Sequence, residues 1–71
     1  MHKDDIDNRF TYHAPQAEND QPARYEQIRG AAREFAHLVN DLTDDSREKS
    51  LAITHIEEAV FWANASIARH E

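Results

Sequence analysis

The apolar residues of this chain fall into two long helical patterns separated by a short polar turn at 43–45. In the first pattern, over about 22–42, apolar positions recur alternately three and four residues apart. This is the spacing of a helix face that packs along another helix. Pro22 suits the first turn, where a missing N–H costs nothing. The face consists of Tyr25, Ile28, Ala32, Phe35, Val39 and Leu42, widened by Ala31, Ala36 and Leu38.

The second pattern, over about 46–69, carries more apolar surface than one partner helix can cover. Asp45 and Glu48 have the spacing of a capping box at its start. The face expected to meet the first helix consists of Ile53, Ile56, Val60, Ala63 and Ile67. A second set lies outside that face: Ala52, Ala59, Phe61, Trp62, Ala65 and Ser66. Small residues permit close approach and aromatic residues are enriched at interfaces, so we expect the chain to oligomerise through this helix.

Residues 1–21 have no sustained period and contain several turn formers. They predict an irregular arm, with one short helical turn near Asp4–Phe10. The sequence therefore predicts an all-α fold, an antiparallel helical hairpin with an N-terminal arm or short helix. We expect a single domain over 1–71, with the arm at 1–21 and helices at about 22–42 and about 46–69.

The composition of the chain excludes several classes of function. A chain of 71 residues is marginally stable without a disulfide, a structural metal or a partner. It has no cysteine, which excludes disulfides, thiolate metal sites and a thiol nucleophile. We therefore expect oligomerisation to supply the missing stability. The net charge of −6, from fourteen acidic and eight basic residues, argues against binding to DNA or RNA polymers. A small anion needs only a few arginines at short range. No apolar leader or membrane span is visible, so we expect no membrane association.

The polar residues do not form a catalytic set. His55 and Glu58 lie three apart, but a second ligand pair and an H-E-x-x-H spacing are missing, so a solvated pair is the better reading. Ser46, Ser50 and Thr54 come with no nucleophile elbow or glycine-rich loop. We therefore expect a protein that is not an enzyme, with no catalytic residue, metal or cofactor.

A glycine inside the first helix is unusual, because it costs about 1 kcal/mol relative to alanine. Gly30 lies between Arg29 and Arg33, which are four residues apart and share one side of the helix. A flat or anionic group could approach the backbone there between two cations. The alternative is a close helix–helix contact at Gly30, with the arginines paired to Glu26 and Glu34. Spacing alone leaves both open.

A second group of cations and hydroxyls opens the second helix. Backbone N–H groups, hydroxyls one turn apart and an arginine make a competent phosphate site. The alternative is a surface network in which the cations answer nearby carboxylates. The group consists of Arg47, Lys49, Ser50 and Thr54, and the carboxylates belong to Asp44, Asp45 and Glu48.

Four sequence blocks, at 7–15 (DNRFTYHAP), 25–29 (YEQIR), 46–52 (SREKSLA) and 57–69 (EEAVFWANASIAR), resemble the small phage anti-CBASS nucleotide sponges of the type 2 family. The resemblance covers nearly the whole chain. It implies helical hairpins that assemble into a hexamer, a trimer of dimers. It further implies that they sequester the cyclic oligonucleotide messengers of bacterial anti-phage immunity without cleaving them.

The resemblance also implies where ligands bind. A cyclic dinucleotide such as 3′,3′-cyclic GMP–AMP would lie between two protomers, against Tyr12 and a cation of the first helix. Arg29 matches that cation best, with Arg33 as the alternative. His13 and Pro15 would line the same pocket. A cyclic trinucleotide would lie where three protomers meet, and the residues expected there are Arg47, Ser50 and Thr54.

Together these expectations describe a non-enzymatic sponge that acts in the host bacterial cytoplasm. Its partners would be cyclic di- and trinucleotides and other copies of the chain, with no nucleic-acid polymer and no membrane. The alternative is an acidic helical protein-interaction module or inhibitor with no nucleotide ligand, which the net charge of −6 favours mildly.

Overall fold

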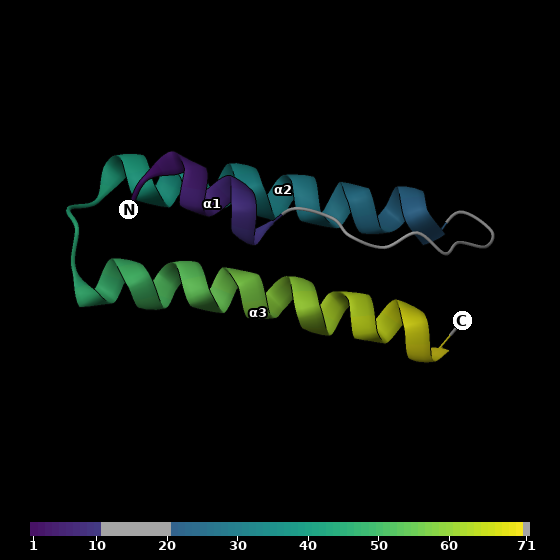
Figure 1. The fold of residues 1–71 in the computed structure, drawn as a ribbon. Helices are drawn as coiled ribbons and strands as arrows, with labels where there is room; N and C mark the ends of the chain where they lie inside the picture. Colours follow the sequence, from purple (N-terminus) through teal and green to yellow (C-terminus); the bar gives the residue numbers. More distant parts are fainter. Residues whose placement is uncertain (11–20, 71) are drawn as a thin grey trace.

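The computed structural model describes residues 1–10 and 21–70, which contain three helices and no strand (Figure 1). The helices are α1 (Lys3–Arg9), α2 (Gln21–Leu42) and α3 (Arg47–His70). α2 and α3 lie side by side and antiparallel, and α1 packs on α2 near the turn. The expected all-α helical hairpin with a short N-terminal helix is thus confirmed. None of the described helices has the length and apolar character of a membrane span.

The start of α3 differs from the expected capping box. Ser46 is the N-cap, because its Oγ accepts a hydrogen bond of 3.1 Å from the backbone N–H of Lys49. The prediction of Asp45 as the cap was wrong. The Asp45 carboxylate is instead paired with the amino group of Met1 and with Nζ of Lys49, 3.3 Å away. Glu48 consequently lies two residues after the N-cap, and not the three that a capping box requires, so the predicted capping box is not formed.

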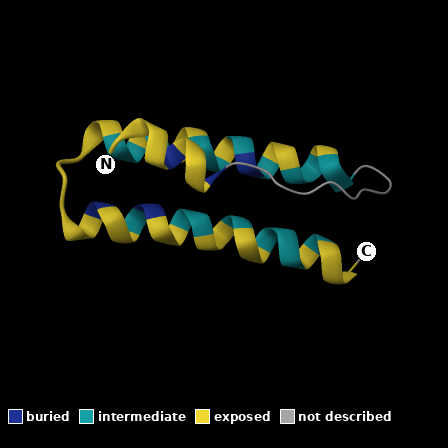
Figure 2. Cartoon of the chain, in the orientation of Figure 1, coloured by how far each residue is buried: buried dark blue, intermediate teal, exposed yellow. Residues whose placement is uncertain are grey.

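The core is small and α1 supplies half of it. Ile6 and Phe10, from α1 and its C-cap, are buried together with Ala36 of α2 and Ile53 of α3. A ring of half-buried residues surrounds them: Met1, Ala32, Val39, Ile56 and Val60. In Figure 2 the buried residues of α3 lie in the half nearest the turn.

The buried face of α2 is rotated from the predicted one. Ala36, expected only to widen that face, is fully buried, whereas Phe35 is 55% and Leu42 74% exposed. The cause is α1, which packs on α2 and makes the side that bears Ala36 part of the core. On α3 the prediction was better, since Ile53, Ile56 and Val60 do face the core.

Gly30 has open space beside it. A Cβ built there would meet no atom within 4 Å, so the described hairpin makes no close helix contact at this glycine. We predict that Gly30→Ala raises the free energy of unfolding by about 0.5–1 kcal/mol, because alanine is the better helix former. Urea denaturation followed by circular dichroism, at one fixed protein concentration, measures the change. A loss of stability would contradict this prediction and show that the space is filled in solution.

Candidate functional site

The residues expected to hold a cyclic dinucleotide fall on two parts of the chain. Tyr12, His13 and Pro15 lie outside the described residues. Arg29 and Arg33 lie one turn apart on α2, and the structure shows what each contacts.

Arg29 is almost completely buried, at 4% exposure. Its guanidinium forms an ion pair with Glu26 through Nη2, and Nη1 donates to the backbone oxygen of Tyr25 at 3.5 Å. A buried charge is tolerated only when it is paired, and Glu26 provides that pairing. Of the arginine–glutamate pairings considered from the sequence, the pair between Arg29 and Glu26 is therefore present, although Arg29 is buried and not on the surface. An anion that binds Arg29 must share this guanidinium with the Glu26 carboxylate.

Arg33 connects α2 to α1. Its Nη2 donates to the backbone oxygen of Phe10 at 3.3 Å, and its Nε lies 3.9 Å from Oδ1 of Asp7. The same Asp7 oxygen is 2.8 Å from Nε2 of His37, one turn further along α2. This hydrogen bond, and then the charges of His37, Arg33 and Lys3, lower the pKa of Asp7. Sequence reasoning missed both Asp7 and His37, and the only available signal was the four-residue spacing of Arg33 and His37.

The other end of α1 is held at the turn. The backbone oxygen of Met1 accepts from Nδ2 of Asn40 at 2.6 Å, and Lys49 Nζ donates to the backbone oxygen of Asn40 at 2.9 Å. Asp45 lies between the Met1 amino group and Lys49, and the hydrogen bonds from these two groups lower the pKa of its carboxyl. α1 is therefore bound to the hairpin by ionised groups at both ends.

These two carboxylates predict how the protein responds to acid. Because the pKa values of Asp7 and Asp45 are lowered in the folded state, their contribution to stability is complete above the unfolded pKa. It is lost as the pH falls through the lower folded value. We expect thermal stability to fall as the pH drops below about 4, the ordinary pKa of an unfolded aspartate. Melting curves at stepped pH measure this, and an Asp7→Asn, Asp45→Asn double variant should lose less over the same interval. An equal loss in that variant would contradict the assignment.

The group expected to hold a cyclic trinucleotide is exposed. Arg47, Ser50 and Thr54 lie three and four residues apart and so share one side of α3, open to solvent. Lys49 does not join them, because its side chain is buried and bound to Asn40 and Asp45. Of the surface network considered from the sequence, the described residues show one pair, between the buried Lys49 and the exposed Asp45.

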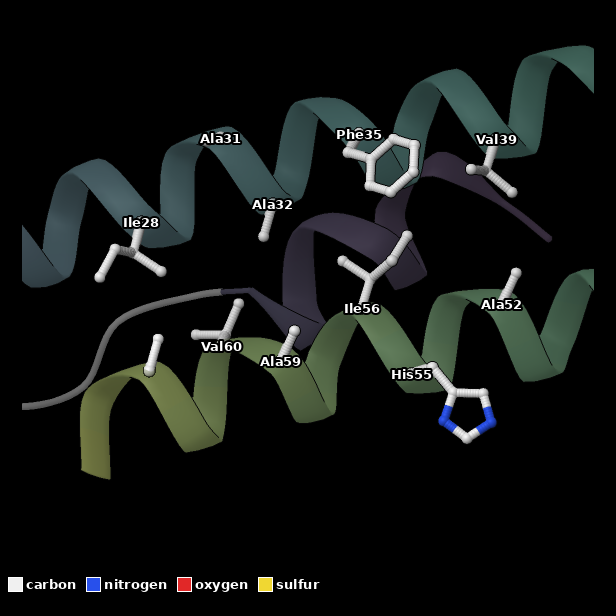
Figure 3. A pocket seen from close by; sticks show the side chains of 11 residues that line it. Ile28, Ala31, Ala32, Phe35, Val39, Ala52, His55, Ile56, Ala59 and Val60 are labelled. Carbon is white, nitrogen blue, oxygen red and sulfur yellow. The ribbon is translucent and has the colours of Figure 1, made fainter. Parts of the chain in front are cut away.

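An apolar groove of about 650 Å³ runs between α2 and α3 (Figure 3). On α2 it is lined by the side that bears Phe35 and not by the side that bears Ala36. The groove is lined by Ile28, Ala31, Ala32, Phe35, Val39, Ala52, His55, Ile56, Ala59, Val60 and Ala63.

A second apolar feature of α3 is an exposed aromatic pair. Phe61 and Trp62 pack edge to face, with 5.1 Å between ring centres, and each remains 59% exposed.

Clustered chemical groups are scarce in the described residues. His55 and Glu58 form an exposed pair, 3.0 Å apart, as the sequence led us to expect. Within 1–10 and 21–70, no group of three or more histidine or acidic side chains could hold a metal ion.

The described part of the chain is thus a small all-α helical hairpin. Its exposed cationic, hydroxyl and apolar surfaces are typical of a binding protein. A family model described as Acb2/Tad1, hairpin domain, matches residues 2–68. The chain belongs to this family, the anti-CBASS type 2 family of phage anti-defence hairpin proteins that its sequence blocks indicated. No curated protein and no solved structure gives a significant match.

Proposed function

We propose that this protein is a phage anti-defence sponge that binds cyclic dinucleotides such as 3′,3′-cyclic GMP–AMP, and cyclic trinucleotides, without cleaving them. By lowering the free messenger in the host bacterial cytoplasm, it would keep the CBASS effector inactive. The observation that carries this proposal is the family match over residues 2–68, nearly the whole chain.

The dinucleotide site we propose combines Tyr12, His13 and Pro15 with Arg29 of α2, or with Arg33 in its place. A cyclic dinucleotide presents two flat bases and two phosphates, and stacking a base on an aromatic ring is worth about 1–3 kcal/mol. Arg29 supports this role because its guanidinium is held in place by Glu26 and the Tyr25 backbone oxygen. A side chain already ordered loses little entropy when a phosphate arrives.

The trinucleotide site we propose consists of Arg47, Ser50 and Thr54. Their shared exposed side of α3 supports this role, since the guanidinium and the two hydroxyls are accessible to a ligand from solvent. Around a three-fold axis, one arginine from each protomer would face one phosphate of the ligand.

Both sites require assembly, which we propose to be a hexamer built as a trimer of dimers. The apolar groove and the exposed Phe61–Trp62 pair support association, because a soluble monomer rarely leaves large contiguous apolar patches uncovered. Size-exclusion chromatography with light scattering gives the mass. A monomer of 8.2 kDa would contradict this part of the proposal.

The decisive experiment for the function uses purified protein and 3′,3′-cyclic GMP–AMP. Binding is measured by calorimetry, and the complex is then heated to unfold the protein so that the released nucleotide can be identified by chromatography. We expect tight binding and recovery of the intact cyclic nucleotide. A cleaved product would contradict sequestration, and no binding of any cyclic di- or trinucleotide would favour the acidic protein-interaction module instead.

A further inference from the structure

α1 cannot be stable by its own helical propensity. Isolated helices shorter than about 12–15 residues are marginal in water, and α1 has 7 residues. Its helical state depends on docking through the buried side chains of Ile6 and Phe10 and through the polar contacts at its two ends. The contacts at the C-terminal end involve two α2 side chains, Arg33 and His37.

These contacts hold Phe10, the C-cap residue of α1, in two ways. The side chain of Phe10 is buried at 2% exposure, and its backbone oxygen accepts the hydrogen bond from Arg33. A cation at a helix C-terminus is also favourable to the helix dipole. Asp7, one turn earlier, is bound by His37 and lies beside Arg33. We call these four residues, Asp7, Phe10, Arg33 and His37, the α1 anchor.

The anchor is close in sequence to a residue of the proposed dinucleotide site. Tyr12 follows Phe10 by two residues, and each step along a trans chain spans about 3.8 Å between Cα atoms. On α2, Arg29 lies one turn from Arg33. The anchor thus holds Phe10, two residues before Tyr12 in the sequence, against Arg33, which lies one helical turn from Arg29.

We propose that the α1 anchor positions the nucleotide site, and that Arg33 is a positioning residue rather than a ligand contact. This inference rests on the proposed function. When only a fraction of the protein is competent to bind, the apparent affinity falls by that fraction. Releasing the anchor should therefore weaken nucleotide binding without removing any group that touches the ligand.

Asp7→Ala separates the two roles of Arg33. If Arg33 positions α1, Asp7→Ala and Arg33→Gln should each weaken binding of 3′,3′-cyclic GMP–AMP by about 3- to 10-fold, and the double variant should be no worse than either. If Arg33 contacts the ligand, Asp7→Ala should leave affinity unchanged or increase it, since it removes a carboxylate beside the guanidinium. Glu34→Ala, an exposed acidic position of α2, is the charge-matched control and should bind like the wild type.

Hydrogen exchange of the α1 amides, measured without nucleotide, tests the anchor independently. We expect faster exchange in Asp7→Ala and Arg33→Gln and unchanged exchange in Glu34→Ala, with α3 protected in all three. Unchanged exchange in Asp7→Ala overturns the anchor. Faster exchange with wild-type affinity in Asp7→Ala overturns the positioning role and leaves the proposed function standing. A wild-type protein that binds no cyclic nucleotide overturns the proposed function and the positioning role together, while the exchange result still decides the anchor.

Discussion

Ile53→Ala should lower the free energy of unfolding by about 2–5 kcal/mol, because it opens a cavity in a fully buried position. Ile53 is the α3 residue in the buried cluster with Ile6, Phe10 and Ala36, so its side chain helps to hold all three helices together. A domain of this size rarely has more than about 3–5 kcal/mol of stability in total. We therefore expect a large unfolded fraction at room temperature, seen as a loss of helical circular dichroism.

Leu51→Ala is the matched control on the same helix. Leu51 is 44% exposed, so its truncation should cost less than about 1 kcal/mol. Both variants are compared by urea denaturation at the same protein concentration, since assembly makes stability depend on concentration. If Ile53→Ala destabilised the protein no more than Leu51→Ala, the core would not be centred on Ile53.

The long elements of this fold were readable from the sequence because their period is long and regular. The predicted bounds of about 22–42 and about 46–69 lie within a residue or so of α2 and α3. The rotation of the α2 face was not readable, because a period identifies a helix but not which neighbour covers it. Ala36 is buried by a short helix whose docking depends on tertiary contacts.

The candidate site likewise has residues that the sequence identified and side-chain contacts that it could not predict. Tyr12 and Arg29 were selected by a resemblance between sequence blocks, which needs no structure. Two further facts depend on three-dimensional contacts: Arg33 donates to the Phe10 backbone oxygen, and Lys49 donates to the Asn40 backbone oxygen. An arginine or lysine side chain is long and flexible, so its partner cannot be inferred from its position on a helix alone.

Tyr12→Ala should weaken binding of 3′,3′-cyclic GMP–AMP by about 5- to 150-fold, the equivalent of about 1–3 kcal/mol for one lost base stack. Calorimetry on the purified variant measures this. The chain should keep its helical circular dichroism and its mass by light scattering, because the loss concerns the ligand and not the hairpin.

Tyr12→Phe is the control that isolates stacking, since it keeps the ring and removes only the hydroxyl. It should bind within a few-fold of the wild type, because every base offers a face to an aromatic ring whether or not that ring bears a hydroxyl. Equal losses in the two variants would assign the binding energy to the hydroxyl group. Wild-type affinity in Tyr12→Ala would remove Tyr12 from the site, and the base would then require another platform.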